Sequence, residues 1–554
     1  MKDSIGRILE RIDGRGYKAY KDLVGASERI GGVRVRVTRV QGDPFAPPSV
    51  VMVDAPLGDN PLYHEYPIPV ADYALRLAYR LSARYSIRGA GEGHSGEVRV
   101  PRPGPVILRR SAAGIITGSR GGVVLRLRLW VGLPSRRRRI LGNVAKELLL
   151  SRLPRLAVEV ARGLEREEAR LERHVNAWRE QEFIRERLPS MGLVSFIGDG
   201  SILPRACGGC EEPLEGAVPF ESPESLRVEL ELPTGRSVTG MGVREGLTLV
   251  AGPAFHGKTT LMEAIACGVW DHVPGDGREL VVTRRDAFWV QSENGRWVSC
   301  VDVSPWVESM PGLRDPHCWS TSDASGATSA VASLQEAVEA GSRLILIDED
   351  WTATNFIHRD RWTEEVTGKR TLLSVSDLAP ALKKAGISVV IVASGSIPLL
   401  ASADTVIVMD EYKPRDATSY AEKARRVAVE AGLAPAGASY TPPSRRRLVE
   451  AFTLVKPKLR GRILEARNLR DTVDLSGLRQ LEEQAQLNTL LPVAQRLTSR
   501  PGVLVAEAKR LEEGIRRGEW ESIDRNPGPG LSEVRWLDVL YLVNRLPGLR
   551  VARG

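Results

Sequence analysis

A glycine-rich loop followed by Lys258 and Thr259 is the stretch of this sequence that most clearly predicts chemistry. It reads AGPAFHGKTT over residues 251–260, with four residues between Gly252 and Gly257. Glycines at these positions let successive backbone N–H groups point at phosphate oxygens, and a following helix adds the positive end of its dipole. The lysine of such a loop reaches the β and γ phosphates, and the threonine hydroxyl binds magnesium. The pattern therefore predicts a site for ATP and Mg²⁺ formed by Gly252, Pro253, Ala254, Phe255, His256, Gly257, Lys258, Thr259 and Thr260. 

Two acidic residues behind an apolar run form a second candidate set. Asp348 and Glu349 follow the stretch LILI at 344–347, which has the composition of a buried strand. A carboxylate at the end of such a strand can hold Mg²⁺, and Asp348 has this position. A carboxylate one residue further can orient or deprotonate an attacking water, so Glu349 is the candidate catalytic residue beside Lys258. The alternative is an exposed acidic loop, which the buried strand and the upstream P-loop disfavour.

A third stretch, DASGATSAVASLQEAVEAG at 323–341, predicts a helix with an open N-terminus. Ser325 and Gly326 stand before its apolar face, and Gly341 is suited to end it. The free N–H groups of such a helix start form a second phosphate-binding surface. The small residues alone do not indicate a phosphate site, but their position just ahead of the strand that ends in Asp348 favours one.

His256, inside the P-loop, is interpreted as a spacer whose backbone binds phosphate.

The elements that must position these residues predict an α/β fold with three segments. Residues 1–190 mix short alternating strands with helices and form a basic α/β N-terminal domain. Residues 191–430 alternate apolar strands with helical patterns, which indicates a P-loop NTPase core with a largely parallel sheet. After a linker rich in Pro, Ala and Gly, residues 431–554 are predicted to be a basic, mainly helical C-terminal domain.

The net charge is unevenly distributed along the chain. It is +14 for residues 1–190, −12 for 191–430 and +7 for 431–554, which together give the net +9. Residues 101–150 alone carry eleven positive charges and one negative charge. One interpretation is an ordinary solvated surface rich in arginine. The other is a patch that binds a polyanionic backbone, which makes nucleic acid a candidate partner.

The composition indicates a globular protein of the cytoplasm. Hydrophobic residues make up 42% and charged residues 27% of the chain. The N-terminus lacks the apolar run of a secretory signal, and the apolar stretch at 386–403 contains a glycine and a proline, so no membrane partner is expected. Five cysteines are too few for a disulfide framework, and Cys207 and Cys210 are interpreted as two thiols in a loop, with a metal site as the alternative.

Several motifs together resemble the family of predicted ATPases of the ABC class, along nearly the whole chain. They are GDPFAPPS at 42–49, GDGSILPR at 198–205, HVPGDGRE at 272–279, DASGATS at 323–329 and IDEDWTATNF at 347–356. The resemblance implies a signature loop at Ser325 and Gly326. It also implies a head-to-tail homodimer in which the P-loop of one subunit and the signature loop of the other enclose one ATP. The family is further associated with RNA handling.

These features predict an ATPase that dimerises around ATP and moves its basic flanking domains on nucleic acid, with RNA favoured over DNA. The alternative is an ATP-dependent dimeric scaffold that hydrolyses slowly and has no nucleic-acid cargo. Typical ABC domains carry a histidine after the strand that follows the acidic one, whereas this sequence offers Ser394 or Ser396 there. An aromatic residue for adenine stacking is sought about 25 residues before the P-loop, where Phe220 is the nearest candidate.

Overall fold

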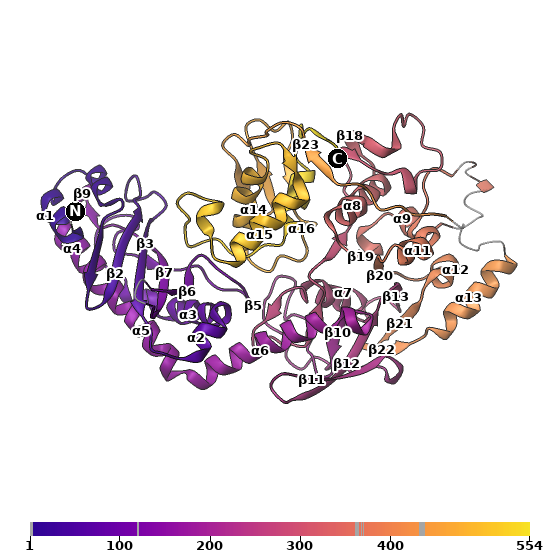
Figure 1. Cartoon of the computed structure of the whole chain (residues 1–554), viewed down its shortest axis with the longest axis horizontal. Helices are drawn as coiled ribbons and strands as arrows, with labels where there is room; N and C mark the ends of the chain where they lie inside the picture. Colours follow the sequence, from indigo (N-terminus) through magenta and orange to yellow (C-terminus); the bar gives the residue numbers. More distant parts are fainter. Residues whose placement is uncertain (1–3, 119–120, 360–364, 367, 369, 432–437) are drawn as a thin grey trace. The chain divides into compact units, whose positions relative to one another are not determined.

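The computed structural model describes residues 4–118, 121–359, 365–366, 368, 370–431 and 438–554, and it divides the chain into two compact units (Figure 1). Unit 1 consists of Met1–Trp178, Glu483–Thr489 and Glu513–Glu533, and unit 2 consists of Arg179–Glu482, Leu490–Glu512 and Val534–Gly554. This division differs from three consecutive segments, because the stretches after residue 482 alternate between the units. The predicted domain boundaries at 190 and 430 therefore stay predictions.

Unit 1 is built on an antiparallel sheet of strand order β1-β2-β3-β7-β4, in which β6 also pairs with β7. Valines and arginines alternate in β2, so the valines are buried and the arginines exposed, as the period of a strand requires. Helices α3 and α5 contact each other and strands of the sheet. The strands are β1 (Ser27–Ile30), β2 (Val33–Arg39), β3 (Ser49–Pro56), β4 (Val98–Arg99), β5 (Val106–Ile107), β6 (Ala113–Thr117), β7 (Val123–Val131), β8 (Ser135–Arg136) and β9 (Arg139–Ile140). The helices are α1 (Ile5–Ile12), α2 (Pro61–Glu65), α3 (Pro67–Ser82), α4 (Gly142–Glu147) and α5 (Leu153–Arg166), and α6 (Glu168–Arg187) continues into unit 2.

Residues from the far end of the chain complete the interior of unit 1. The buried Arg110 guanidinium donates from Nη2 to Glu483 Oε2 at 2.9 Å, and the same carboxylate accepts the Gly104 N–H at 3.0 Å. Next to this pair, the Ser111 N–H donates to the Leu531 carbonyl at 2.9 Å. Buried charges are tolerated only when they are paired and hydrogen-bonded. Unit 1 therefore depends on residues 483–489 and 513–533 as well as on its N-terminal segment.

Unit 2 holds a six-stranded sheet of order β16-β19-β20-β13-β21-β22, whose neighbours are parallel except for the antiparallel pair of β21 and β22. These strands are β13 (Leu247–Ala251), β16 (Ala287–Val290), β19 (Leu344–Asp348), β20 (Ser388–Val392), β21 (Thr405–Asp410) and β22 (Lys413–Asp416). The predicted parallel sheet is confirmed. In a parallel sheet all carboxyl ends lie at one edge, and ligands bind at that edge.

The remaining elements of unit 2 surround this sheet. An antiparallel sheet has the order β11-β12-β10-β15, and β17 pairs with β18 as a hairpin. The strands of this sheet and hairpin are β10 (Leu193–Gly198), β11 (Arg227–Glu231), β12 (Ser237–Arg244), β15 (Val281–Thr283), β17 (Arg296–Val301) and β18 (Trp319–Ala324), and β14 (Asp271–His272) is a further short strand. The helices are α7 (Lys258–Cys267), α8 (Gly326–Ala340), α9 (Thr354–Ile357), α11 (Val375–Lys384), α12 (Ile397–Ser402) and α13 (Ser419–Glu430).

The residues after 438 contain short strands as well as helices. The helices are α14 (Gln484–Leu497), α15 (Leu504–Arg516) and α16 (Trp536–Asn544). The strands are β23 (Arg446–Leu448), β24 (Lys458–Arg460), β25 (Ile463–Glu465), β26 (Val473–Asp474), β27 (Gly502–Val503) and β28 (Val551–Arg553). The sequence analysis missed these strands because none exceeds three residues, which is too short for an alternating pattern to be read.

The cysteines differ from the expectation of free thiols. Cys207 and Cys210 are joined by a disulfide, and the hairpin of β17 and β18 brings Cys300 and Cys318 together as a second one. Cys267 is the free, buried cysteine. In the part of the chain that the structure describes, no group of His, Cys, Asp and Glu has the arrangement of a metal site. Within the same residues, no helix combines the length and the apolar character that a membrane span needs.

Candidate nucleotide site

The P-loop joins the end of β13 to the start of α7, as the sequence predicts. Gly252 has φ +135°, and a Cβ there would lie 2.3 Å from the Met409 carbonyl oxygen, so only glycine fits against β21. Gly257 has φ +93° and directly precedes the helix. Lys258 Nζ donates to the carbonyl oxygens of Gly252 and Pro253, both at 2.8 Å. The ammonium group therefore lies over the loop, within reach of phosphates that the loop would bind.

Asp348 ends β19 with a buried carboxylate. Its Oδ1 accepts the Asp350 N–H at 3.0 Å, while its buried Oδ2 has no hydrogen-bond partner among the described residues. Burial raises the pKa of Asp348, and hydrogen bonds from Asp350 and the Thr259 side chain oppose that rise without cancelling it. An unpartnered carboxylate oxygen near a threonine hydroxyl is a donor set that suits Mg²⁺. The residues predicted to bind the metal therefore fit it chemically.

Glu349 is held by the residue that follows the neighbouring strand. Its Oε2 accepts the Ser394 N–H at 2.7 Å and the Ser394 hydroxyl at 2.9 Å. Because β19 and β20 are adjacent and parallel, their ends bring the two residues to the same edge of the sheet. Ser394 thus fixes the orientation of the Glu349 carboxylate. Of the two serines that the sequence offered at this point, Ser394 contacts the acid.

One open cavity at this edge, with a volume of about 1020 Å³, collects most of the predicted residues. The predicted residues that line it are Gly252, Pro253, Ala254, Phe255, Gly257, Lys258, Thr259, Thr260, Asp348 and Glu349. Lining residues outside that prediction are Asp350, Val392, Ala393, Ser394 and Tyr412. His256 is absent from the lining, and its ring nitrogen Nδ1 accepts the Glu411 N–H at 2.9 Å. The histidine therefore anchors the loop to the turn after β21.

Tyr412 is the aromatic residue of this cavity that the sequence analysis missed. It is 56% exposed in the turn between β21 and β22, and a Cβ at Gly257 would lie 3.4 Å from its ring. The turn is far from the P-loop in sequence and close to it only because β21 lies beside β13. A search upstream of the P-loop could not find it.

Two family models match this sequence. One describes the N-terminal part of ATPases of the ABC class and matches residues 2–163, and the other describes the P-loop domain of the ABC ATPase and matches residues 167–441. The chain belongs to the ATPases of the ABC class. As an ABC-type P-loop ATPase, it has a site whose lysine and acids lie together in one cavity.

Individual relatives of this ABC-class ATPase share less. The uncharacterized protein MJ1628 of Methanocaldococcus jannaschii is 30% identical over 262 residues, which cover 45% of this chain and 58% of that protein. The ADP conformation of MJ1267, an ATP-binding cassette of an ABC transporter, is 12% identical, covers 37% of this chain and 94% of its own, and gives a TM-score of 0.24. CbiO1 of Clostridium perfringens, part of the ABC transporter complex cbiONQ, is 14% identical, covers 37% and 96%, and gives a TM-score of 0.24.

The predicted signature loop at Ser325 and Gly326 lies outside the cavity that holds the P-loop. Ser325 is the exposed N-cap of α8, and Gly326 is the first residue of that helix. A Cβ at Gly326 would lie 3.1 Å from Asn294 Oδ1, so the helix start rests on the segment 291–294. Neither Ser325 nor Gly326 lines the cavity of Lys258 in the same chain.

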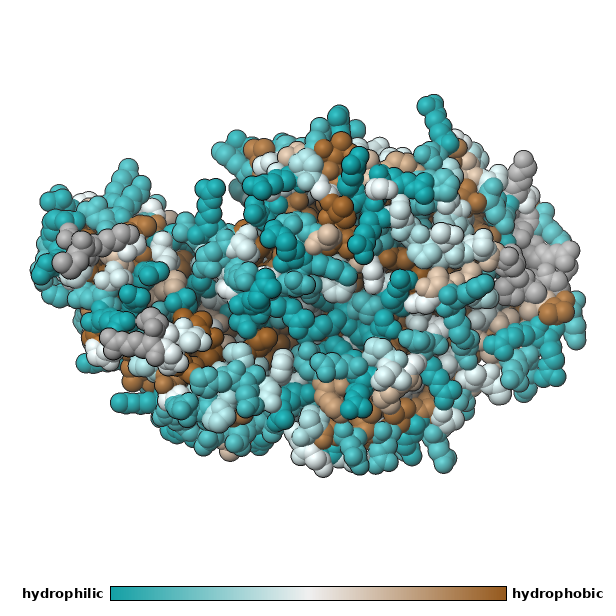
Figure 2. Space-filling model, in the orientation of Figure 1, coloured by the Kyte–Doolittle hydropathy of each residue, from teal (hydrophilic) through white to brown (hydrophobic). Residues whose placement is uncertain are grey.

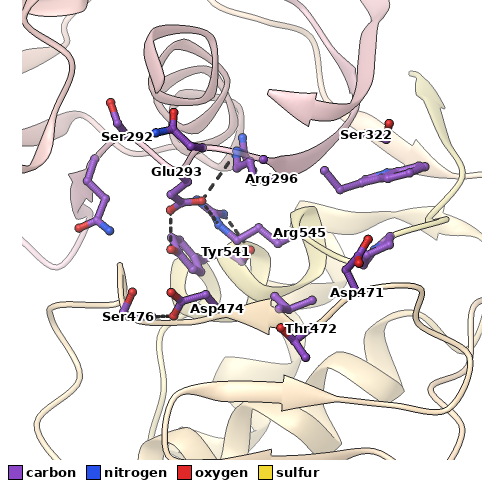
Figure 3. Close-up of a pocket in the computed structure, with 16 residues that line it drawn as sticks. Ser292, Glu293, Arg296, Ser322, Asp471, Thr472, Asp474, Ser476, Tyr541 and Arg545 are labelled. Atoms are coloured by element: carbon purple, nitrogen blue, oxygen red, sulfur yellow. Dashed lines mark hydrogen bonds and ion pairs between the residues drawn. The ribbon is translucent and has the colours of Figure 1, made fainter. Parts of the chain in front are cut away.

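Glu293 contacts Tyr541 and Arg545 at the C-terminal helix α16 (Figure 3), and two further hydrogen bonds link it to the predicted signature loop. Its carboxylate accepts the Tyr541 hydroxyl at 2.5 Å and the Arg545 Nε at 2.6 Å, and its backbone N–H donates to the Ser329 hydroxyl at 2.8 Å. Ser329 in turn donates to the Gly326 carbonyl at 2.8 Å. Burial raises the pKa of Glu293, but the Arg545 guanidinium outweighs burial and leaves it lowered. A series of hydrogen bonds through Glu293 and Ser329 therefore connects α16 to the start of α8.

Removing Arg545 should therefore destabilise unit 2. Arg545→Met removes the nearer cation of the buried Glu293 carboxylate and leaves it with Arg296, whose Nε lies 3.8 Å away, so the loss should cost up to about 3–5 kcal/mol, the cost of a broken buried pair. Urea unfolding followed by tryptophan fluorescence should record a lower midpoint for this variant. Arg550→Met is the matched control, because Arg550 and its partner Glu450 have exposed side chains and should contribute less than about 1 kcal/mol. Equal midpoints for the two variants would contradict a structural role of the Arg545 pair.

Proposed function

We propose that this chain binds ATP with Mg²⁺, closes head to tail into a homodimer around two ATP molecules, and couples hydrolysis to movement of its basic regions on nucleic acid, with RNA favoured over DNA. One observation carries the dimer: the helix start at Ser325 and Gly326 is separate from the cavity of Lys258 in the same chain. A helix N-terminus that binds phosphate has no phosphate to bind within its own subunit, and a second copy supplies one.

The residues of the cavity divide the work of hydrolysis. Lys258 stabilises the charge on the β and γ phosphates, and Thr259 with Asp348 would hold Mg²⁺, which neutralises the same charge when bound. Glu349, fixed by Ser394, orients a water for attack on the γ phosphorus and accepts a proton from it. The bond from the γ phosphorus to the bridging oxygen breaks, and ADP and inorganic phosphate leave.

Tyr412 is proposed to stack on the adenine base. Because base–aromatic stacking contributes about 1–3 kcal/mol, Tyr412→Ala should raise the KM for ATP by about tenfold and leave kcat nearly unchanged. Tyr412→Phe keeps the ring and should behave like the wild type. Tyr420→Ala removes an equally exposed tyrosine on α13, outside the cavity, and serves as the control. An unchanged KM in Tyr412→Ala would show that the base binds elsewhere.

Nucleic acid is proposed as the cargo because of the positive charge of the N-terminal region. Arg136–Arg139 form a run of exposed arginines at the turn of the hairpin of β8 and β9, with Arg137 and Arg138 between the two strands. Binding to phosphates releases counterions, so log affinity falls with log salt concentration by roughly 0.7 for each phosphate contact on a single strand. Changing Arg136, Arg137, Arg138 and Arg139 to Ala should weaken RNA binding and flatten this slope, with little change in sequence preference.

Fluorescence anisotropy of a labelled RNA over a salt series would measure that effect. Changing Lys383 and Lys384 to Ala removes two positive charges from the acidic central region and should leave binding nearly unchanged. Absence of RNA and DNA binding by the wild type at low salt, with and without ATP, would remove nucleic acid from the proposal.

The scaffold alternative rests on Ser394. A serine, rather than a histidine, contacts Glu349, so the site lacks a cationic side chain at this position. A dimer of that kind would bind ATP firmly and hydrolyse it slowly. The steady-state rate of phosphate release, measured with and without RNA, decides between the two proposals. A rate that RNA stimulates supports an ATPase that moves its basic regions on nucleic acid, and a slow rate that RNA does not change supports the scaffold.

A further inference from the structure

An exposed phenylalanine beside the arginine turn of unit 1 has no role in the nucleotide site. Phe45 is 63% exposed, although phenylalanine is among the residues most often buried. It belongs to the motif GDPFAPPS at 42–49, which ATP chemistry does not explain. Hydrophilic side chains predominate on the visible face at the end of unit 1 where β9 lies (Figure 2).

The loop that carries Phe45 is held in one conformation. The Phe45 N–H donates to Asp43 Oδ1 at 2.8 Å, and the Pro44 carbonyl accepts the His94 N–H at 2.9 Å. A Cβ at Gly93 would lie 2.3 Å from the Pro44 oxygen and 3.1 Å from the Phe45 ring, so the two loops touch. A ring that is fixed before binding loses little conformational entropy when a ligand stacks on it.

The same second loop also holds the arginine turn. The Glu92 N–H donates to the Ser135 carbonyl at 3.1 Å, and Glu92 Oε1 accepts the Arg138 N–H at 2.6 Å. Residues 91–94 therefore contact the Phe45 loop on one side and the turn of β8 and β9 on the other. One short segment thus links the loop of the phenylalanine to the turn of the arginines.

The arginine turn itself has an unfavourable backbone. Arg137 and Arg138 have φ +50° and +57°, a left-handed conformation that residues with a Cβ rarely adopt. The turn is anchored by Arg139, whose Nη1 donates to the Gly14 carbonyl at 3.0 Å. Within the described residues, the side chains of Arg136, Arg137 and Arg138 form no ion pair. Strained residues that persist in a structure are typical of functional sites.

We propose that Phe45 and Arg136–Arg139 form one binding site for single-stranded nucleic acid. Phe45 stacks on an unpaired base, and the arginines neutralise the phosphates beside it. This combination of an aromatic ring and a positive surface is how proteins bind single strands, whose bases are free to stack. A duplex offers the same phosphates but keeps its bases stacked inside, so Phe45 contributes nothing to its binding. This inference rests on the proposed function, in that it assumes that unit 1 contacts nucleic acid, and it adds which form is bound.

The test compares single-stranded oligouridine with an RNA duplex of equal length, using the full chain and fluorescence anisotropy. Phe45→Ala should weaken oligouridine binding by about tenfold at every salt concentration, with an unchanged salt slope and unchanged duplex affinity. Phe45→Trp should retain the wild-type affinity. Changing Arg136–Arg139 to Ala should weaken both ligands. Tyr79→Ala, which removes a half-exposed tyrosine from α3 of the same unit, is the control and should bind as the wild type does.

The possible failures are distinguishable. If the wild type binds neither oligonucleotide, the nucleic-acid function and this site both fall. If the arginine variant loses affinity while Phe45→Ala keeps it, nucleic acid is bound without stacking and only this inference is wrong. If Phe45→Ala weakens both ligands equally, Phe45 supports the surface and does not select single strands. Phe45→Leu keeps an apolar side chain in the loop, and loss of affinity in this variant, with an unchanged melting temperature, excludes misfolding as the cause.

Discussion

Mixing Lys258→Ala subunits with Gly326→Asp subunits should restore ATP hydrolysis that neither variant has alone. In a head-to-tail dimer, each site takes Lys258 from one chain and Gly326 from the other. Both defects then fall in one site of the mixed dimer, and the other site is built from intact parts. Random mixing makes about half of the dimers mixed, so about a quarter of the wild-type activity should return if the sites act independently.

The structure supplies the steric control for this experiment. A Cβ at Gly326 would lie 3.1 Å from Asn294 Oδ1, so a small shift admits alanine. Gly326→Ala should therefore lose much less activity than Gly326→Asp, whose carboxylate repels the phosphates. Strict cooperation between sites would hide the rescue. Trapped ATP per dimer, measured with Glu349→Gln added to both chains, reports the intact site directly.

Full activity of Gly326→Asp alone would contradict the composite site. The binding site for the γ phosphate would then be complete within one chain. The proposed head-to-tail dimer would be wrong, although the chain would still belong to the family.

Glu349→Gln should lower kcat by about a thousandfold while ATP binding remains. The amide oxygen of glutamine can still accept the hydrogen bonds from Ser394, so the local structure is kept and only the base is lost. With Lys258 still in place, ATP stays bound and the closed dimer accumulates. Gel filtration with ATP should then resolve a dimer that the wild type, which reopens after hydrolysis, does not retain.

Asp350→Asn is the matched control for Glu349→Gln. Asp350 is an acid in the same cavity, but it contacts Asp348 through its backbone N–H, so its carboxylate has no assigned role in the reaction. Its substitution should change kcat by less than about tenfold. If Glu349→Gln hydrolyses ATP at the wild-type rate, a group other than Glu349 is the general base.

The nucleotide site could be predicted because its main parts are local. Lys258 and Thr259 begin the helix that directly follows the glycine-rich loop, and Asp348 ends a strand whose apolar residues identify it. The parts that the sequence analysis missed depend on the order of strands in the sheet. Tyr412 enters the cavity only because β21 lies beside β13. Ser394, one of two candidates from the sequence, was singled out only because β20 lies beside β19.

The short strands and the long-range pairings of the C-terminal region escaped prediction for a related reason. Its strands are too short to show a period, and the partners of Glu483 and Arg545 lie hundreds of residues away in the chain. Such pairings depend on the tertiary structure and leave no local pattern.

The way the chain threads through the two units limits how it can be divided. The backbone passes from one unit to the other five times, at 178–179, 482–483, 489–490, 512–513 and 533–534. After protease cleavage at any single crossing, the backbone would still connect the two units at the four other crossings. The two fragments of a nicked protein should therefore stay together until the protein is denatured. A recombinant fragment ending near residue 178 would keep Asp72 but lack Glu483, the second carboxylate that pairs with the buried Arg110, and should be poorly soluble. A single cut or fusion point in the gene therefore cannot separate one unit from the other.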